Sequence, residues 1–551
     1  MVLLTVLVKV GIILRAHASD HMQIQNISFQ QFSQFSYRDV EYQLNPEKFL
    51  DFIGFLPDFK GLKKAVQIRK QYPVDRPLLV RVLEEQYAGY SLSSKQQNNI
   101  NNLRKEDTFT ITTAHQPALF TGPAYYMYKI LSTVRLAEEL SLKMPGINFV
   151  PVFVNGSEDH DFEEVNHTFL FNKQVAWNNH KKGPVGKYNI EGLADAIAEF
   201  SKILGQGEKA VKLKNLLSDV YNKSRNYNDF TRGLLHGLTA RYGLLVLNMD
   251  NPDLKRAFIP VMKRELLGQV SEKIVLETQQ KLAEAGYKPQ AFPRPINLFY
   301  FTEDGGRERV LMADELYTVN GTAIQWTKEE ILSELNKRPE NFSPNVVLRP
   351  VYQESILPDL AFVGGGGEIA YWMERKEQFR AFNVFFPVLI RRNSVFIVVK
   401  STSNIMEKLN MRFIDFIHDE EKIIHEFLAK SGDSHDLFEK QKLALDDLWG
   451  SLSVHVTTYD KTLTGFMEAE KSKMVKIIDH VEQKLYRARK QHEETKIQQL
   501  KNVKEKLFPN KNIQERVDNF FQFYLQYEED LLDILVEELN PLDKDCKILF
   551  L

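Results

Sequence analysis

The sequence predicts an α/β protein: a Rossmann-like, doubly wound parallel sheet with helical connecting insertions, followed by a C-terminal antiparallel coiled coil. Short β-branched segments alternate with helical ones between about residues 109 and 390, an order typical of parallel sheets. Beyond about Lys400 the chain is rich in Glu, Lys, Leu and Ile and poor in Gly, which indicates helices. A chain of 551 residues exceeds what one hydrophobic core usually organises, so we expect at least two structural units.

The first two strands and their connecting helix define the start of the sheet. Residues 109–113 and 148–154 are apolar and β-branched, as buried parallel strands are. The segment between them has a helical pattern that begins after Thr121-Gly-Pro123, and Pro fits a first helical turn. A right-handed crossover is the default connection. We expect further strands at residues 244–249, 296–302, 360–363 and 385–390, and a helix over residues 266–285.

The pattern divides the chain into a core at residues 22–399, with a mainly helical insertion at about residues 171–241, and a coiled coil at residues 400–510. Residues 511–551 should form a helical segment that packs back on the body. The apolar side chains of the coiled coil step by four and three and then resume on a shifted register. Because such a seam must be buried, we expect a homodimer through this segment. The seam consists of Met474, Ile478, Val481, Leu485, Ala488 and His492, then Ile497, Leu500, Val503 and Leu507.

Composition argues against several classes of protein. Lys and Arg number 71 against 73 for Asp and Glu, a net charge of -2, so the chain lacks the positive excess that nucleic-acid binding uses. Hydrophobic residues at 43% fit a globular chain and not a many-helix membrane protein. The single cysteine, Cys546, excludes an internal disulfide and a Cys-based zinc site, and indicates a cytoplasmic protein. We interpret the basic face of the coiled coil as solvated, with a nucleotide site as the alternative.

The first chemical motif is AHQPALFTGP, residues 114–123, where a strand ends and a helix begins. Ligands bind at such junctions in open parallel sheets. His115 and Gln116 would face the ligand, and Gly122 would let it approach the helix start, where free N–H groups favour anions. The alternative is a well-packed turn in which Thr121 caps the helix.

The second motif is SEDHDFEEVNH, residues 157–167, with five carboxylates and two imidazoles in eleven residues. Carboxylates this close repel when ionised, so the cluster favours a function that offsets their charge, such as binding a substrate ammonium group. We expect general acid/base catalysis by His160 between Asp159 and Asp161, with Glu158 beside them. A solvated acidic helix start is one alternative. A metal site is another, but the spacing matches no HExxH-type pattern, so we assign no metal to His160, Asp161, Glu164 and His167.

The third motif is LRPVYQESILPDLAFVGGGGEIAYW, residues 348–372. Its four consecutive glycines are more than a turn requires, yet they match neither GxGxxG nor the P-loop. If a helix starts near Glu368, Tyr371 and Trp372 would share its face and form a wall for a sugar or an ammonium group; Trp372 in the core is the alternative. Arg349 is the candidate for a substrate carboxylate, which a guanidinium can hold at two points.

The three motifs HQPALFTGPAYYMYK, SEDHDFEEVNH and LRPVYQESILPDLAFVGGGGEIAYW together resemble the bacillithiol biosynthesis cysteine-adding family, BshC, over about residues 22–551. The resemblance implies a nucleotidyltransferase-like Rossmann core, a dimerising coiled coil and, as the last step of bacillithiol biosynthesis, the condensation of L-cysteine with glucosaminyl-malate. Ala118 stands where the family more often has Gly, and Gly366 where a small residue or Pro is expected. The residues that match are His115, Gln116, Thr121, Gly122, Glu158, Asp159, His160, Asp161, Glu163, Glu164, Arg349, Gly364, Gly365, Gly367, Glu368 and Tyr371.

The chemistry that the resemblance implies requires an activated cysteine carboxylate, so we expect ATP, although no nucleotide motif is present and the sequence gives no sign of Mg²⁺. We place the activating phosphate at the helix start near His115 and Gly122. A general-base role for His160 would make His160→Gln lose turnover at least about a hundredfold. Two other interpretations fit the same pattern: another Rossmann-type amino-acid ligase or nucleotidyltransferase, and a non-catalytic coiled-coil protein that binds a metabolite.

The start of the chain gives a first prediction. Residues 1–19 contain the apolar run VLLTVLVKVGIIL, but a signal peptide carries its positive charge before such a run, whereas Lys9 lies inside it and Arg15 follows it. The residues before Met22 also have no counterpart in the family that the chain resembles. We therefore predict that N-terminal sequencing of the native protein finds Met22 first. A protein that begins earlier would show the prediction to be wrong.

Overall fold

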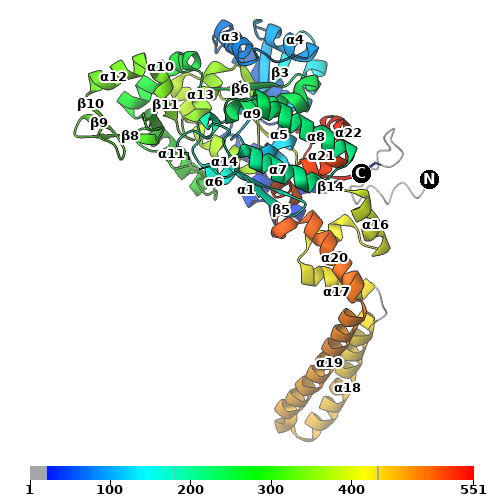
Figure 1. Ribbon diagram of the computed structural model, residues 1–551. Helices are drawn as coiled ribbons and strands as arrows, with labels where there is room; N and C mark the ends of the chain where they lie inside the picture. Colours follow the sequence, from blue (N-terminus) through cyan, green and yellow to red (C-terminus); the bar gives the residue numbers. More distant parts are fainter. Residues whose placement is uncertain (1–21, 180, 431–433) are drawn as a thin grey trace. The chain divides into compact units, whose positions relative to one another are not determined.

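The computed structural model describes residues 22–179, 181–430 and 434–551, so the predicted extension at residues 1–21 lies outside the described residues. The chain divides into two compact units (Figure 1). The sheet unit consists chiefly of residues 25–396 and 514–548, and the helical unit chiefly of residues 397–513.

The sheet unit contains a five-stranded parallel sheet in the order β13-β12-β2-β3-β6. The chain enters at the central strand, adds two strands on one side, and then returns to add two on the other side. This order confirms the doubly wound, Rossmann-like sheet, and its switch point lies between β2 and β12. The strands are β2 (Thr108–His115), β3 (Asn148–Asn155), β6 (Leu245–Asn248), β12 (Asp359–Gly364) and β13 (Val388–Arg391).

Helices cover both faces of the parallel sheet, which explains why its strands are apolar throughout. On one face, α2 (Phe59–Arg69) and α5 (Tyr125–Lys143) pack against Ile111 and Val363. The other face carries the larger cluster, in which Phe362 packs against α13 and α14. The helices that contribute to this second cluster include α3 (Arg76–Gln86), α10 (Pro252–Gly268), α13 (Arg349–Ile356) and α14 (Gly366–Trp372).

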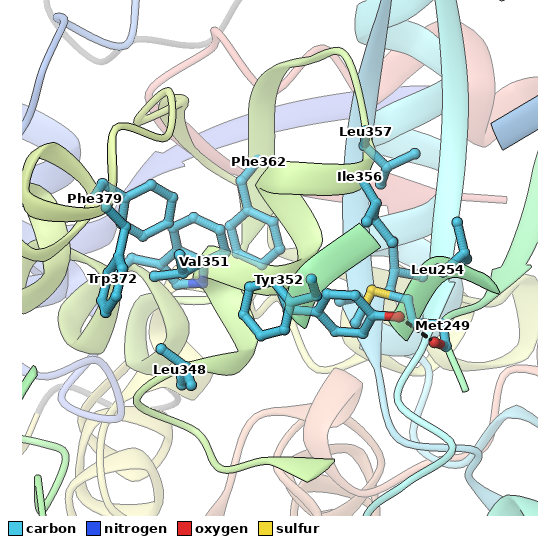
Figure 2. Close-up of a cluster of buried hydrophobic side chains, with 14 of the residues drawn as sticks. Met249, Leu254, Leu348, Val351, Tyr352, Ile356, Leu357, Phe362, Trp372 and Phe379 are labelled. Atoms are coloured by element: carbon cyan, nitrogen blue, oxygen red, sulfur yellow. Dashed lines mark hydrogen bonds between the residues drawn. The ribbon is translucent and has the colours of Figure 1, made fainter. Parts of the chain in front are cut away.

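The larger cluster contains the third motif (Figure 2). The ring of Trp372 stacks on Phe362 with centroids 4.3 Å apart, and Phe379 packs beside it. The Tyr352 hydroxyl donates a 2.6 Å hydrogen bond to the Met249 carbonyl. Trp372 is therefore a core residue, and the aromatic wall that the sequence predicts beside Glu368 is wrong as to Trp372.

A second five-stranded sheet is absent from the sequence prediction. The strand expected at residues 296–302 is β7, but it pairs in an antiparallel sheet of order β10-β9-β8-β7-β11 and not in the parallel one. The outer strands are short and largely exposed, so they lack the apolar runs that marked the parallel strands. The members are β7 (Leu298–Phe301), β8 (Arg307–Ala313), β9 (Leu316–Val319), β10 (Gln325–Trp326) and β11 (Phe342–Pro344).

The remaining segments of the sheet unit are mainly helical. A polar run before the first parallel strand forms α4 (Ser94–Asn102), whose start is fixed by a capping box between Ser93 and Gln96. The predicted helix at residues 266–285 is broken at Gln269, which has φ 47°. Further helices in the region before the sheet and in the insertion are α1 (Tyr37–Leu44), α7 (Leu193–Leu204), α8 (Glu208–Lys223) and α9 (Tyr227–Thr239), with a hairpin of β4 (His167–Leu170) and β5 (Lys173–Ala176).

The end of the chain returns to the sheet unit. Helix α22 (Glu529–Glu538) packs on α5, and α21 (Phe521–Tyr527) precedes it. The chain then forms β15 (Asp545–Phe550), which lies between β1 (Gln23–Ser28) and β14 (Val395–Val398). The prediction of an all-helical end is therefore wrong for its last element, β15. This strand is short and follows a helix-rich stretch, so its pattern did not stand out in the sequence.

The helical unit contains the predicted coiled-coil hairpin. Helices α18 (Ser434–Tyr459) and α19 (Thr464–His492) pack antiparallel, with Lys442 3.0 Å from Asp479. The helix breaks at Glu493, where the apolar register shifts, and α20 (Glu494–Leu507) follows. The apolar side chains of α20 are buried in contact with α16 (Lys400–Lys408) and α17 (Glu420–Lys430).

No helix of the residues that the structure describes combines the length and the apolar character needed to cross a membrane.

Glu354 and Asp359 form a buried pair of acidic side chains at the amino end of β12. This is the edge of the sheet opposite the carboxyl ends of the strands. Asp359 accepts hydrogen bonds from Thr110 and Thr112, at 3.0 and 2.7 Å, and Arg69 donates to its carbonyl. Burial raises the pKa of both Glu354 and Asp359, and Glu354 donates to Asp359. The two carboxyl groups therefore share one proton at neutral pH.

This pair predicts a pH-dependent stability. Its folded-state pKa lies above the unfolded value, so stability is full below the unfolded pKa and falls as pH rises toward the folded pKa. Glu354→Gln keeps the donor to Asp359 and removes the shared proton. We predict that the unfolding free energy of the wild type falls relative to this variant by roughly 2–3 kcal/mol between pH 5 and 8, as measured by urea unfolding. The exposed Glu329→Gln serves as control, and parallel pH profiles for wild type and Glu354→Gln would contradict the prediction.

Candidate functional site

The carboxyl ends of the five parallel strands lie at one edge of the sheet. They end at His115, Asn155, Asn248, Gly364 and Arg391. At the switch point, the chain after β2 runs to β3 on one side and the chain after β12 runs to β13 on the other. The crevice between these two connections is where such sheets bind ligands. His115 and Gly364, from the first and third motifs, stand on its two sides.

His115 is held in its neutral form. Its Nδ1 is 2.9 Å from the Gln116 carbonyl oxygen, so Nδ1 carries the hydrogen and Nε2 accepts from the Tyr125 hydroxyl at 2.9 Å. Burial, together with the charge of Lys129, lowers the pKa of His115 to about 4. The ring therefore positions Tyr125 instead of carrying charge.

Gln116 connects the first motif to the second. Its Nε2 donates a 2.6 Å hydrogen bond to Asp159 Oδ2. The two motifs, on the loops after β2 and β3, are thus in direct contact.

The helix start at Gly122 does not face the crevice. Thr121 and Gly122 are buried, the Gly122 N–H donates to the Leu119 carbonyl and the Ala124 N–H to the Asp518 carbonyl. Asn519 donates to the carbonyls of Phe120 and Gly122, both at 2.8 Å. These groups are occupied by the protein, so the geometry disfavours the phosphate position that the sequence predicts at Gly122.

A buried ion pair bridges the switch point. Lys129 on α5 donates to Glu368 Oε2 at 2.7 Å and to the Ala114 carbonyl at 2.6 Å. Burial raises the pKa of Glu368, but Lys129 and the Gly365 N–H lower it more, so its pKa lies below the usual range. Glu368 is therefore an ionised structural partner. The sequence analysis missed Lys129, although a lysine inside the apolar pattern AYYMYKILSTV was a signal that it must be paired.

The glycines in the first turn of α14 are accommodated for different reasons. A Cβ on Gly366 would lie 2.1 Å from the Cγ of Asp39, and Asp39 pairs with Arg391 at 3.1 Å. Only glycine permits that approach, which explains the departure from the family pattern at this position. A Cβ on Gly367 would meet nothing within 4 Å, so Gly367 borders open space.

Arg349 has no carboxylate partner among the residues that the structure describes. Its Nη2 donates to the Tyr371 hydroxyl at 3.3 Å and its Nη1 to Gln353 at 3.0 Å. Both contacts are with neutral groups, so the positive charge remains available to a ligand. This fits the predicted role of Arg349 at a substrate carboxylate.

The carboxylates of the acidic segment do not form a like-charge cluster. Glu158 lies 2.6 Å from the buried Lys255 and accepts a 2.9 Å hydrogen bond from Ser343. Asp161 accepts from the Glu164 N–H and caps the short helix α6 (Phe162–Val165). Glu163 lies in the first turn of that helix. Glu158 and Asp161 therefore have separate partners, while Glu163 and Glu164 are exposed.

Asp159 is a partly exposed carboxylate of this segment that lies beside the first motif. Its side chain is 40% exposed, and it accepts from Gln116 and from the His160 N–H. Burial raises its pKa, but the Gln116 hydrogen bond and the Arg307 charge lower it more, so its pKa lies below the usual range. An ionised carboxylate with amide donors is suited to an ammonium group.

His160 is positioned by Arg307. Arg307 Nη1 is 3.1 Å from His160 Nδ1, and its Nε and Nη2 donate to Ser343 and the Pro344 carbonyl. Because a guanidinium only donates, Nδ1 accepts and Nε2 carries the hydrogen. This tautomer makes His160 a hydrogen-bond donor toward solvent and disfavours the predicted role as general base. The sequence analysis also missed Lys255 and Arg307, because they come from α10 and the second sheet.

Within the described part of the chain, no three His, Cys, Asp or Glu side chains gather as a metal site would. The Nδ1 of His167 contacts the Asn166 side chain at 3.0 Å.

Comparison with known proteins matches nearly all of the described chain. The N-terminal Rossmann-like domain of bacillithiol biosynthesis BshC matches residues 22–393, and the C-terminal coiled-coil domain of BshC matches residues 395–551. A protein of Flavobacterium johnsoniae, named as a candidate cysteine ligase BshC, is 40% identical over 95% of this chain and 99% of its own length. Proteins of the same name from Christiangramia forsetii and Bacillus cereus are 37% and 30% identical over 95% and 82% of this chain, and over 98% and 85% of their own lengths. The chain therefore belongs to the bacillithiol biosynthesis BshC family.

Proposed function

We propose that this protein is a cysteine ligase that joins the carboxyl group of L-cysteine to the amine of glucosaminyl-malate. Membership of the BshC family and the names of the relatives support a cysteine ligase. The observation that carries the proposal is Asp159: an ionised, partly exposed carboxylate that contacts no Lys or Arg side chain in the described residues, at the edge where a Rossmann sheet binds its ligand. It supplies a place for a substrate ammonium group, and Arg349 supplies one for a substrate carboxylate.

The chemistry follows from these placements. ATP, as co-substrate, would supply the phosphoryl or adenylyl group that activates the cysteine carboxyl. The sugar amine then attacks the carbonyl carbon, the C–N bond forms, the C–O bond to phosphate breaks, and the amine proton leaves with the phosphate. His160 Nε2–H is placed to donate a hydrogen bond to the oxygen that becomes negative during this attack. Arg307 maintains the tautomer that this role needs.

This role of His160 gives a prediction that differs from general-base catalysis. Gln retains an N–H donor whereas Leu does not, so we predict that His160→Leu lowers turnover about a hundredfold or more and His160→Gln by no more than about tenfold. The assay follows thiol product and nucleotide products by mass spectrometry, with cysteine, glucosaminyl-malate and ATP as substrates. His167→Gln is the matched control and should keep wild-type turnover. If the His160→Gln and His160→Leu variants lose activity equally and at least a hundredfold, His160 acts as a general base and not as a hydrogen-bond donor.

We also propose that the protein is a homodimer through the hairpin of α18 and α19. Of the predicted seam, Met474 is 40% exposed and Val481 51%, and outside the seam Ile477 is exposed by 57% and Leu448 by 54%. The predicted seam along α19 is therefore not covered by α18 alone. Since contiguous exposed apolar surface marks an interaction site, a second copy of the hairpin is the partner that fits an antiparallel seam.

The dimer is tested best by substitution. Deleting Thr462 to Lys506 would also remove most of α20, whose apolar side chains are buried within the helical unit. We predict that Ile477→Glu combined with Val481→Glu yields a folded monomer, because two charges would be buried at the seam. Light scattering at micromolar concentration measures the mass. Exposed Lys473→Glu is the control and should remain dimeric. A wild-type monomer would reject the proposal.

A further inference from the structure

The crevice at the switch point carries a second group of charged side chains that the reaction described above does not use. Arg392 follows β13, and its backbone N–H donates to the Gly364 carbonyl at 2.8 Å. The guanidinium is 3% exposed; Nη2 donates to Glu515 at 2.8 Å and Nη1 to the Asn393 carbonyl at 2.7 Å. Its Nε is buried and has no hydrogen-bond partner in the described part of the chain. A buried donor of this kind calls for an acceptor.

The space beside Arg392 is bordered by the glycine turn. A Cβ on Gly365 would lie 3.7 Å from Arg392 Nε, and one on Gly367 would meet nothing within 4 Å. Both glycines thus leave the turn bare next to the guanidinium. The Arg392 guanidinium also lies 5.1 Å from the centre of the Tyr125 ring, whose hydroxyl contacts His115.

Arg516 brings a second guanidinium to the same place. It directly follows Glu515, the ion-pair partner of Arg392, and its own guanidinium has no hydrogen bond or ion pair with any described residue. Burial, with the charges of Glu368 and Glu164, raises the pKa of Tyr125 to about 12, while the charges of Arg392 and Arg516 act to lower it, so both guanidinium groups act on this ring.

The charges around the crevice do not balance. Three cations have acidic partners: Arg391 with Asp39, Arg392 with Glu515, and Lys129 with Glu368. Arg516 has none among the described residues, and partial desolvation of its guanidinium, with repulsion from Arg392, lowers its pKa. Two guanidinium groups that repel each other, one of them beside the bare Gly365, leave a positive site for an anion.

We propose that Arg392 and Arg516 bind a phosphate group in the crevice between β2 and β12. Phosphate fits better than carboxylate because its several oxygens can accept from Arg392 Nε and from the fork of Arg516 together, and its second negative charge offsets the unpaired cation. The proposal deepens the ligase function, on which it rests, by placing the activating phosphate here and not at Gly122. The phosphate belongs to a nucleotide or is free phosphate.

The test uses the full-length protein and three probes: inorganic phosphate, ATP and adenosine, each titrated by calorimetry. We expect Arg516→Gln to weaken binding of ATP and of inorganic phosphate about tenfold or more, since a charged hydrogen-bond donor is lost. Adenosine affinity should not change. The exposed Arg104→Gln, which removes an equal charge far along the chain, is the control. Because Arg516 is itself exposed, the variant should fold, which its urea midpoint verifies.

The outcomes separate the two sources and the two proposals. Competition between ATP and inorganic phosphate for the wild type identifies the nucleotide as the source, whereas phosphate binding without ATP binding identifies free phosphate. Binding of both probes by Arg516→Gln within twofold of the wild type, or no binding of either probe by the wild type, would overturn the phosphate site. Failure to form the cysteine product while Arg516 still controls phosphate binding would overturn the ligase function alone.

Discussion

The ion pair between Lys129 and Glu368 is the interaction on which the arrangement of the site depends. Lys129 is 1% exposed, and a charge at such depth is tolerated only when it is paired. Its partner lies in the turn after β12, so the pair fixes the two sides of the switch point relative to each other. Loss of one member of a buried pair costs about 3–5 kcal/mol in general. Tyr371 lies on α14, the helix that carries Glu368, and its hydroxyl accepts a hydrogen bond from Arg349 on α13.

The same principle recurs around the carboxyl edge of the sheet. The pairs Arg391–Asp39, Arg392–Glu515 and Lys255–Glu158 each join segments that are far apart in the sequence. The second sheet contributes Arg307 and Ser343 to the acidic segment, so this sheet, which stands outside the Rossmann core, helps to position the His160 ring. Buried pairs are weak evidence for stability but strong determinants of which groups may approach each other.

Local sequence patterns predicted most helices and strands, whereas the roles of the site residues depend on contacts between distant parts of the chain. The parallel strands, the hairpin and the break near Glu493 followed from apolar periodicity, whereas the contact between Gln116 and Asp159 was found only in the structure. The second sheet was missed because most of its strands are short and β8 and β10 are largely exposed. The role expected for Gly122 failed because its occupants, Asp518 and Asn519, lie about 400 residues later. The assignment of the site residues to individual steps stays a prediction.

The contact of Asn519 with the loop before α5 has a consequence for biosynthesis. Its side chain closes hydrogen bonds to Phe120 and Gly122 over sequence separations of 399 and 397 residues. Contacts of such separation form late, because the intervening chain must first be closed into a loop. On the ribosome, the loop before α5 emerges long before Asn519, and the whole helical unit is made between them. The first motif must therefore wait, with its carbonyl groups hydrated, until the last tenth of the polypeptide has been synthesised.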